Sequence, residues 1–276
     1  MAMKKTILAR CLLVSFLGFA VCAVVVAQQT PRPAPTAADW ANLAKLPDFT
    51  GVWELSFGAP PPRGGAPVGP AAAGRGRGRG GAAGPSLTPE YAAKKKAFDA
   101  NPPEDSETAN CLPPGMPGIM GQPYPMEFLL TPGQVTIVIE AYTQVRHIYT
   151  DGRPLPADPD LKFHGTSVGR WQGDTLIVET VGFSPLTQLD RGVPHGDKMR
   201  ILERFRLSDP DTMTIETTIT DPDALTMPYT ANRTLKRHRN WTIAEYVCEE
   251  NNRNSVDASG KAGINLSSST APTKKD

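Results

Sequence analysis

The 276-residue chain lacks an excess of charge of either sign, because 29 Lys and Arg residues face 28 Asp and Glu residues. A formal net charge of +1 gives no electrostatic basis for binding nucleic acid. Hydrophobic residues make up 39% of the chain and charged residues 21%, which excludes a wholly disordered chain and a polytopic membrane protein. This composition indicates a globular protein with irregular additions.

Motifs for nucleotide, hydrolase and metal chemistry are also missing. No Walker lysine follows a glycine-rich loop, no GxGxxG follows a strand, and no GxSxG elbow is present. The histidines show neither HxH nor HExxH spacing, so they predict no metal site. Met116, Met120 and Met126 would suit Cu(I), but such methionines more often fill gaps in a core. The sequence therefore predicts no cofactor and no metal.

Residues 1–27 have the features of a secretory signal peptide. Basic residues precede an apolar stretch over residues 11–26, and small residues offer a cleavage site after Ala27. We therefore expect a periplasmic or secreted protein with no stable membrane span after cleavage. Two alternatives stay open, namely an uncleaved N-terminal anchor and lipidation at Cys22.

Cysteine is scarce, with four in the whole chain, and removal of the signal peptide would leave Cys111 and Cys248. Compartments outside the inner membrane are oxidising, so this pair predicts a disulfide bond. A catalytic thiol is the alternative. The bridge would join the Pro-rich first half of the chain to its last strand.

The two halves of the chain differ in composition. Most of the 28 prolines precede residue 126, and residues 58–86 are almost entirely Gly, Ala, Pro and Arg. Such a segment buries too little apolar surface to offset its ordering entropy, so it is predicted to be a disordered insertion. Its Arg/Gly repeat at 74–80 resembles RNA-binding segments, but export would separate it from nucleic acid, and a weak contact with anionic cell-surface polymer is the alternative. Residues 28–48 are predicted to form an extension, and residues 254–276 a disordered tail.

Residues 49–253 are predicted to form a single β-rich domain with one short helix. The helix is expected over residues 89–99, with Thr88 as the capping residue and Pro89 in the first turn. Elsewhere apolar and polar residues alternate, and turn residues separate the segments. The candidate strands are 49–55, 126–131, 134–141, 143–149, 164–171, 175–182, 199–207, 212–220, 228–237 and 240–249.

Ten strands with short connections predict an all-β antiparallel meander. A closed or nearly closed lipocalin-like barrel would hide the edges of such a meander best. A two-sheet sandwich is the alternative.

Alternation also identifies carboxylates on apolar strand faces. Glu203 shares its strand face with apolar residues, as does Glu245 in the segment 240–249, and Glu179 is a third candidate. A carboxylate inside a barrel must be paired, hydrogen-bonded or protonated. Possible partners are the arginines in or beside strands, namely Arg146, Arg153, Arg170 and Arg233.

Two functional hypotheses follow. In the first, the barrel binds a small, partly apolar molecule in its interior, with contacts from Arg146, Tyr149, Arg170, Trp171 and Glu245. In the second, a cofactor-independent lyase, isomerase or hydrolase acts on a sugar, aromatic or terpenoid compound. Its acid–base groups at the barrel mouth would be Glu203, His164, His195 and Asp197.

A purely structural Arg/Glu network with surface histidines is the simpler interpretation of the same residues. An envelope interaction protein that uses its Pro-rich half is a third class. The sequence predicts a small-molecule partner and no nucleic acid, and it predicts no oligomeric state.

The tripeptide Gly51-Val52-Trp53 resembles the G-x-W opening of lipocalin-type barrels, in which the tryptophan closes the barrel base. The resemblance implies that an arginine of a late strand, Arg233 or Arg237, packs on Trp53. It also implies a small, mostly apolar ligand in the interior.

A broader resemblance covers roughly residues 111–251. Four motifs carry it, namely CLPPGMP at 111–117, IYTDGR at 148–153, GRWQGDTL at 169–176 and EYVCEEN at 245–251. Together they resemble a family of exported bacterial β-rich proteins. The resemblance implies export and a single β-rich domain, and it places the Arg/Gly insertion outside the common fold. It implies no particular activity.

Overall fold

The computed structural model describes residues 34–57, 84–102, 111–248, 255–256 and 262–263. The predicted signal peptide, most of the 58–86 insertion and most of the 254–276 tail lie outside the described residues. The chain divides into two units, Met1–Pro35 and Thr36–Asp276, and the features below belong to the second.

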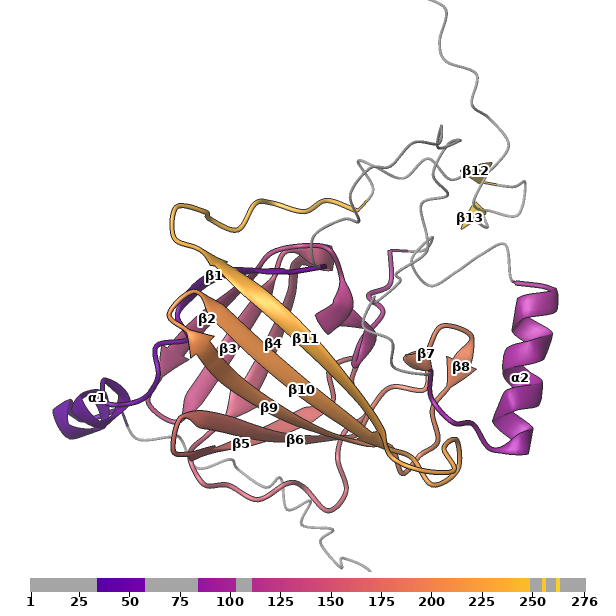
Figure 1. Cartoon of the computed structure of the whole chain (residues 1–276), viewed down its shortest axis with the longest axis horizontal. Coiled ribbons are helices and arrows are strands. Elements are labelled where there is room, and N and C mark those ends of the chain that lie inside the picture. Colours follow the sequence, from indigo (N-terminus) through magenta and orange to yellow (C-terminus); the bar gives the residue numbers. More distant parts are fainter. Residues whose placement is uncertain (1–33, 58–83, 103–110, 249–254, 257–261, 264–276) are drawn as a thin grey trace, which may run out of the picture. The chain divides into compact units, whose positions relative to one another are not determined.

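Nine strands close into a β-barrel (Figure 1). They are β1 (Gly51–Leu55), β2 (Met126–Thr131), β3 (Gln134–Ile139), β4 (Gln144–Tyr149), β5 (Thr166–Gln172), β6 (Thr175–Val181), β9 (Arg200–Asp209), β10 (Thr212–Thr220) and β11 (Tyr229–His238). Their order around the barrel is β1-β11-β10-β9-β6-β5-β4-β3-β2, and β1 pairs with both β11 and β2. The predicted all-β closed barrel is confirmed, with nine strands instead of about ten.

The prediction of a tenth strand over residues 240–249 is wrong. Within the described chain, residues 241–247 have no regular secondary structure and no ladder partner. Closure explains this difference, because β1 bonds β11 on one side and β2 on the other, which leaves no free edge for a further strand. Glu245 lies exposed in this segment, so its predicted inward orientation is also wrong.

One strand pair departs from the predicted antiparallel meander. β4 and β5 are parallel and pair at Ile148↔Ser167 and Tyr149↔Val168. Parallel neighbours need a crossover connection in place of a tight hairpin. Residues 150–165, which include three prolines, form that connection and return the chain to the end of the barrel from which β4 starts.

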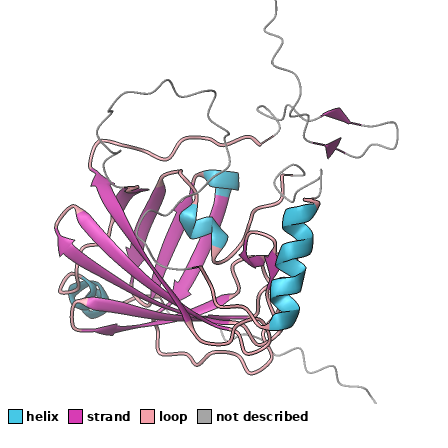
Figure 2. Ribbon diagram, turned by 45° about the vertical axis from the view of Figure 1, so that its right-hand side comes forward, coloured by secondary structure: helices cyan, strands magenta, loops and turns pink. Residues whose placement is uncertain are grey.

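The structure contains further short elements besides the barrel strands (Figure 2). They are α1 (Ala37–Leu43), α2 (Pro89–Ala100), the 3-10 turns η2 (Gly118–Gly121) and η3 (Ala141–Thr143), and the strand pairs β7 (Gln188–Asp190) with β8 (Val193–Pro194) and β12 (Ser255–Val256) with β13 (Ala262–Gly263). The predicted helix is confirmed as α2, whereas α1, which a Thr36/Asp39 capping box begins, is unpredicted. Thr88 is the N-cap of α2, but its hydroxyl donates to the carbonyl of Asp223 instead of capping the helix. None of the described helices has the length and apolarity needed to cross a membrane.

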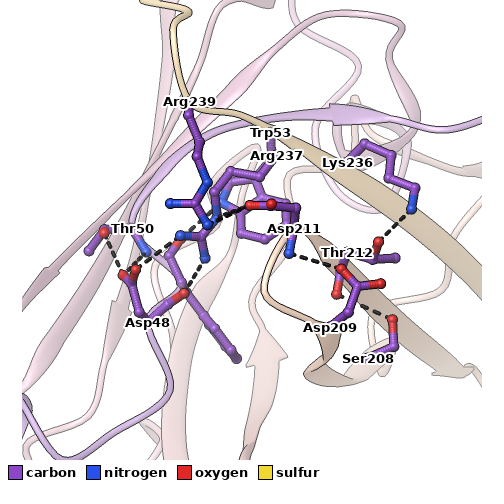
Figure 3. A network of polar contacts seen from close by, with 11 residues as sticks. Asp48, Thr50, Trp53, Ser208, Asp209, Asp211, Thr212, Lys236, Arg237 and Arg239 are labelled. Carbon is purple, nitrogen blue, oxygen red and sulfur yellow. Dashed lines mark hydrogen bonds and ion pairs between the residues drawn. The ribbon is translucent and has the colours of Figure 1, made fainter.

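The end of the barrel at which β9 and β11 finish is closed by Trp53 and Arg237, and we call this end the base (Figure 3). The Arg237 guanidinium carbon lies 4.5 Å from the centroid of the Trp53 ring, which confirms the expected contact of a late arginine with Trp53. Arg237 also donates to Asp48 at 2.9 Å and lies within 3.9 Å of Asp211. Its side chain is only 6% exposed, so these two carboxylates neutralise a buried charge at the base.

Large apolar side chains fill the barrel above the base. They come from most of its strands and are at most 2% exposed, as in Trp53, Phe128, Ile137, Leu176, Val178, Phe205, Met213, Ile215 and Leu235. Burial of this apolar area is the main stabilising contribution to the fold. The described lower interior is therefore packed core.

The predicted disulfide bond Cys111–Cys248 is present, with the two Cα atoms 5.8 Å apart. It joins the segment 241–248 to the segment 111–125. The segment 241–248 is also held by two hydrogen bonds, from the Thr143 hydroxyl to the Tyr246 carbonyl and from the Ala244 amide to Glu140. The bridge thus anchors the described chain that follows the last barrel strand.

Candidate functional site

A buried ion pair crosses the barrel interior between Arg146 on β4 and Glu203 on β9. Arg146 Nη1 donates to Glu203 Oε1 at 3.2 Å, and Nη2 donates to Oε2. The Arg146 side chain is 1% exposed and that of Glu203 is 0% exposed. β5 and β6 lie between β4 and β9 in the sheet, so the pair joins two strands that are not neighbours. The predicted inward orientation of Glu203 is confirmed.

Two hydroxyl groups complete the coordination of Arg146. Its Nη2 donates to Thr180 Oγ1 at 3.1 Å, and its Nε and Nη2 lie 3.4 and 3.3 Å from Ser167 Oγ. The two hydroxyl oxygens are 2.9 Å apart and bond each other. Alternation places Ser167 on β5 and Thr180 on β6 inside the barrel, where both are buried. A buried charge pair needs this additional hydrogen bonding to offset its desolvation.

Arg233 on β11 is a second arginine near Glu203. Its Nη1 donates to Thr217 Oγ1 at 3.4 Å, which is long for a hydrogen bond. Burial lowers the pKa of Arg233, and the negative charge of Glu203 opposes this effect. Together with Arg146, Glu203 and their hydroxyl partners, Arg233 and Thr217 form what we call the polar layer of the barrel.

His164 lies beside this layer, just before β5. Its Nε2 bonds Gln144 Oε1 at 3.1 Å, and an amide oxygen only accepts, so Nε2 carries the proton. The remaining nitrogen, Nδ1, is buried and has no hydrogen-bond partner among the described residues. Burial and the positive charge of Arg146 lower the pKa of His164 to about 4. The ring is therefore neutral at physiological pH, with an unused acceptor.

The shifted pKa of His164 predicts a pH-dependent stability. The unfolded state takes up this proton near the ordinary histidine pKa of 6.5 and the folded state only at about 4, so the free energy of unfolding falls as the pH decreases between these values. Between pH 7 and pH 5 we expect His164 to account for a loss of roughly 2 kcal/mol.

Urea unfolding of wild type and His164→Gln at pH 7 and pH 5 measures this contribution. His164→Gln should lack this loss of stability between pH 7 and pH 5. His147→Gln, at an exposed histidine on β4, should show the same pH dependence as wild type. Equal pH dependence in wild type and His164→Gln would contradict the prediction.

The segment 111–125, which we call the cover, packs at the end of the barrel opposite the base. Its Met116, Ile119 and Met120 are at most 1% exposed and belong to the barrel core, and the Met116 amide donates to the Phe163 carbonyl at 2.8 Å. At Gly121, an added Cβ would lie 3.6 Å from Arg233 Nη2. The cover therefore faces the Arg233 guanidinium with a glycine, which places no side chain in front of it.

The other predicted acid–base residues lie apart from the polar layer. Both ring nitrogens of His195 lie 2.8 Å from backbone carbonyl oxygens, Nδ1 from that of Gly196 and Nε2 from that of Ser184. Asp197 is exposed. No hydrogen bond or ion pair of the described chain joins His195 or Asp197 to Glu203. The predicted set is therefore split, and only Glu203 and His164 lie near Arg146.

Three predicted ligand-binding residues lie toward the base. β5 runs in the same direction as β9, so Arg170 and Trp171 lie near its base end. Arg170 is exposed and bonds Glu179 at 3.1 Å, while Trp171 packs against Phe49. Tyr149, at the end of β4, has the Arg153 guanidinium 3.9 Å from its ring centroid. The structure therefore does not bring these residues together with Arg146, and Glu245 is exposed as described above.

Sequence reasoning missed a group of tyrosines beside the cover end. Tyr142 and Tyr246 have ring centroids 5.3 Å apart, and those of Tyr124 and Tyr246 are 5.5 Å apart. Burial and the neighbouring tyrosines raise the pKa of Tyr142 to about 12. Its backbone has a positive φ of 58°, a conformation that residues other than glycine rarely adopt. Non-adjacent chain segments build this group, so no local pattern predicted it.

The described residues contain no group of three or more His, Cys, Asp or Glu side chains that could hold a metal ion. A scan against protein-family models, a search of curated proteins and a search of solved structures each found no match. The geometry of the polar layer is therefore the basis for assigning a function.

Proposed function

We propose that this chain is an exported barrel protein that binds a small, partly apolar molecule at the polar layer, beneath the cover. The observation that carries the proposal is unused hydrogen-bonding capacity in an otherwise filled interior. His164 Nδ1 is a buried acceptor without a described partner, and Arg233 makes one long hydrogen bond. Buried polar groups are normally satisfied, so groups left over in such a place favour a ligand.

The packed core below the polar layer limits the position of this ligand. The side chains of Phe128, Phe205 and Met213 are fully buried there, so the described residues of the lower barrel leave no space for a ligand. The ligand would lie between the polar layer and the cover, with its apolar part against Ile119 and Met120. Entry would require the cover to move. Export of the protein and its relationship to lipocalin-type barrels are part of this proposal.

The contacts of Glu203 do not favour the alternative of an acid–base enzyme. Both carboxylate oxygens accept hydrogen bonds from Arg146, which holds Glu203 as the partner of a buried cation. A general acid or base must reach a substrate proton, and this carboxylate is turned toward its arginine. Binding is therefore the function that the geometry supports best.

Calorimetric titration with a small panel tests the proposal. The panel comprises octanoic, citronellic and 2-naphthoic acids and the corresponding alcohols. At least one member should bind with one site per chain. Gly121→Leu should weaken that binding about tenfold or more, because the side chain would occupy the space before Arg233.

Gly121→Ala is the matched control for this titration. Its Cβ would make an ordinary contact at 3.6 Å, so binding should change little. Saturable binding that Gly121→Leu leaves unchanged would move the site away from the polar layer. If no panel member binds the folded wild type, the proposed function is wrong.

A further inference from the structure

The charge of Arg233 is not balanced within the described chain. No described carboxylate lies within ion-pair distance of its guanidinium, although the side chain is partly buried inside the barrel. By contrast, each of the other two arginines that point into the barrel has a direct carboxylate partner: Arg146 pairs with Glu203, and Arg237 pairs with Asp48.

A charge count of the polar layer shows what is missing. Glu203 supplies one negative charge, whereas Arg146 and Arg233 supply two positive charges, and His164 is neutral at physiological pH. The bidentate contact with Arg146 already uses both oxygens of Glu203. One positive charge is therefore left over in a desolvated position, where an unpaired ion is costly.

We propose that the ligand of this barrel is a carboxylate, a small and partly apolar molecule with one negative charge whose oxygens accept hydrogen bonds from Arg233. His164 Nδ1 is an acceptor, so it takes no part in this contact with the carboxylate. This inference rests on the proposed function and adds the chemical class of the ligand. A guanidinium presents two parallel N–H donors that match the two oxygens of a carboxylate. Arg233 has donors available for this contact, because its described hydrogen bond uses Nη1 alone.

The size of the charge excess favours a carboxylate over a phosphate monoester. A monoester carries about −1.5 to −2 charges at pH 7 and would leave excess negative charge in the layer. A carboxylate carries one negative charge and neutralises the layer. Gly121 places no side chain before Nη2, and even an added Cβ would lie 3.6 Å from it. The apolar cover residues Ile119 and Met120 suit the remainder of such a molecule.

The test compares each acid of the panel with its own alcohol on wild-type protein at pH 7. Each pair shares its apolar part, so the ratio of dissociation constants isolates the carboxylate. We expect the acid of the pair that binds to bind at least tenfold more tightly than its alcohol. A charge-assisted hydrogen bond makes a contribution of this order.

Arg233→Met and Arg204→Met then identify the arginine responsible. Arg204 is exposed on β9 and pairs with Glu216 at 3.2 Å, so it is a matched control. Arg233→Met should abolish the preference for the acid, and Arg204→Met should keep it. Competition by inorganic phosphate at equal concentration should be weak.

The possible outcomes separate the two proposals. Equal binding of acid and alcohol to wild type, or an acid preference that survives in Arg233→Met, overturns the carboxylate inference and leaves the binding barrel in place. Stronger binding of phosphate than of any acid also overturns it. Absence of binding by every panel member overturns both proposals. If Arg233→Met does not fold, the ratio of the acid and alcohol dissociation constants on wild type still tests whether the ligand is a carboxylate.

Discussion

Replacing Glu203 with glutamine is expected to lower the free energy of unfolding by about 3–5 kcal/mol. The two side chains have nearly the same size, so the loss does not come from a cavity. It arises because Arg146, 1% exposed, would keep its charge in the barrel interior without an anion. Arg233 would add a second unbalanced charge nearby, which makes a value near the upper end of this range the expected one.

Urea unfolding at pH 7 with a double-variant comparison measures this effect. Arg146→Met combined with Glu203→Gln removes the buried cation as well and should restore most of the stability lost in the single variant. Glu216→Gln removes an exposed ion pair with Arg204 and should cost about 0.5 kcal/mol or less. A Glu203→Gln protein as stable as the Glu216→Gln protein would show that the pair is not buried in solution.

Removing the Cys111–Cys248 bridge is expected to have an equally large effect. The two cysteines are 137 residues apart in the sequence. For a loop of that length, the chain-entropy model gives about 5 kcal/mol of stabilisation through restriction of the unfolded chain. The double variant Cys111→Ser/Cys248→Ser should therefore unfold at a much lower urea concentration than the oxidised wild type.

One control makes this comparison specific. Reduction of the disulfide bond in the wild-type protein should lower its unfolding midpoint to that of the double variant. A double variant as stable as wild type would contradict a disulfide that constrains the fold.

Strand positions were predictable because apolar and polar residues alternate with a period of two along a half-buried strand. The same alternation predicted the inward orientation of Glu203, because Ile201 and Phe205 lie two residues before and after it on the same face. The segment 240–249 shows the same alternation, yet its described residues form no strand. Alternation reports that a segment suits a sheet, but it contains no information on whether a sheet edge is free. In this barrel β1 occupies the edge of β11.

The partners within the site were less predictable for a related reason. Arg146 was one of several candidate arginines for Glu203, and the choice among them depends on which walls of the barrel face each other. His195 looked like a titratable group of the barrel mouth, yet both of its ring nitrogens lie 2.8 Å from backbone carbonyl oxygens. The importance of Gly121 depends on the close approach of the cover to Arg233, which joins residues far apart in the sequence.

Closure of the barrel through β1 has a consequence for the order of folding. β1 is the first barrel strand to be synthesised and β11 is the last, and their contact between Glu54 and His238 joins residues 184 positions apart. Until β11 has left the ribosome, β1 lacks one of its two neighbours and β10 has an open edge. Long-range strand pairing of this kind is slow. The barrel can therefore close only once β11 has emerged, and a chain held unfolded until then avoids the exposed edges that promote aggregation.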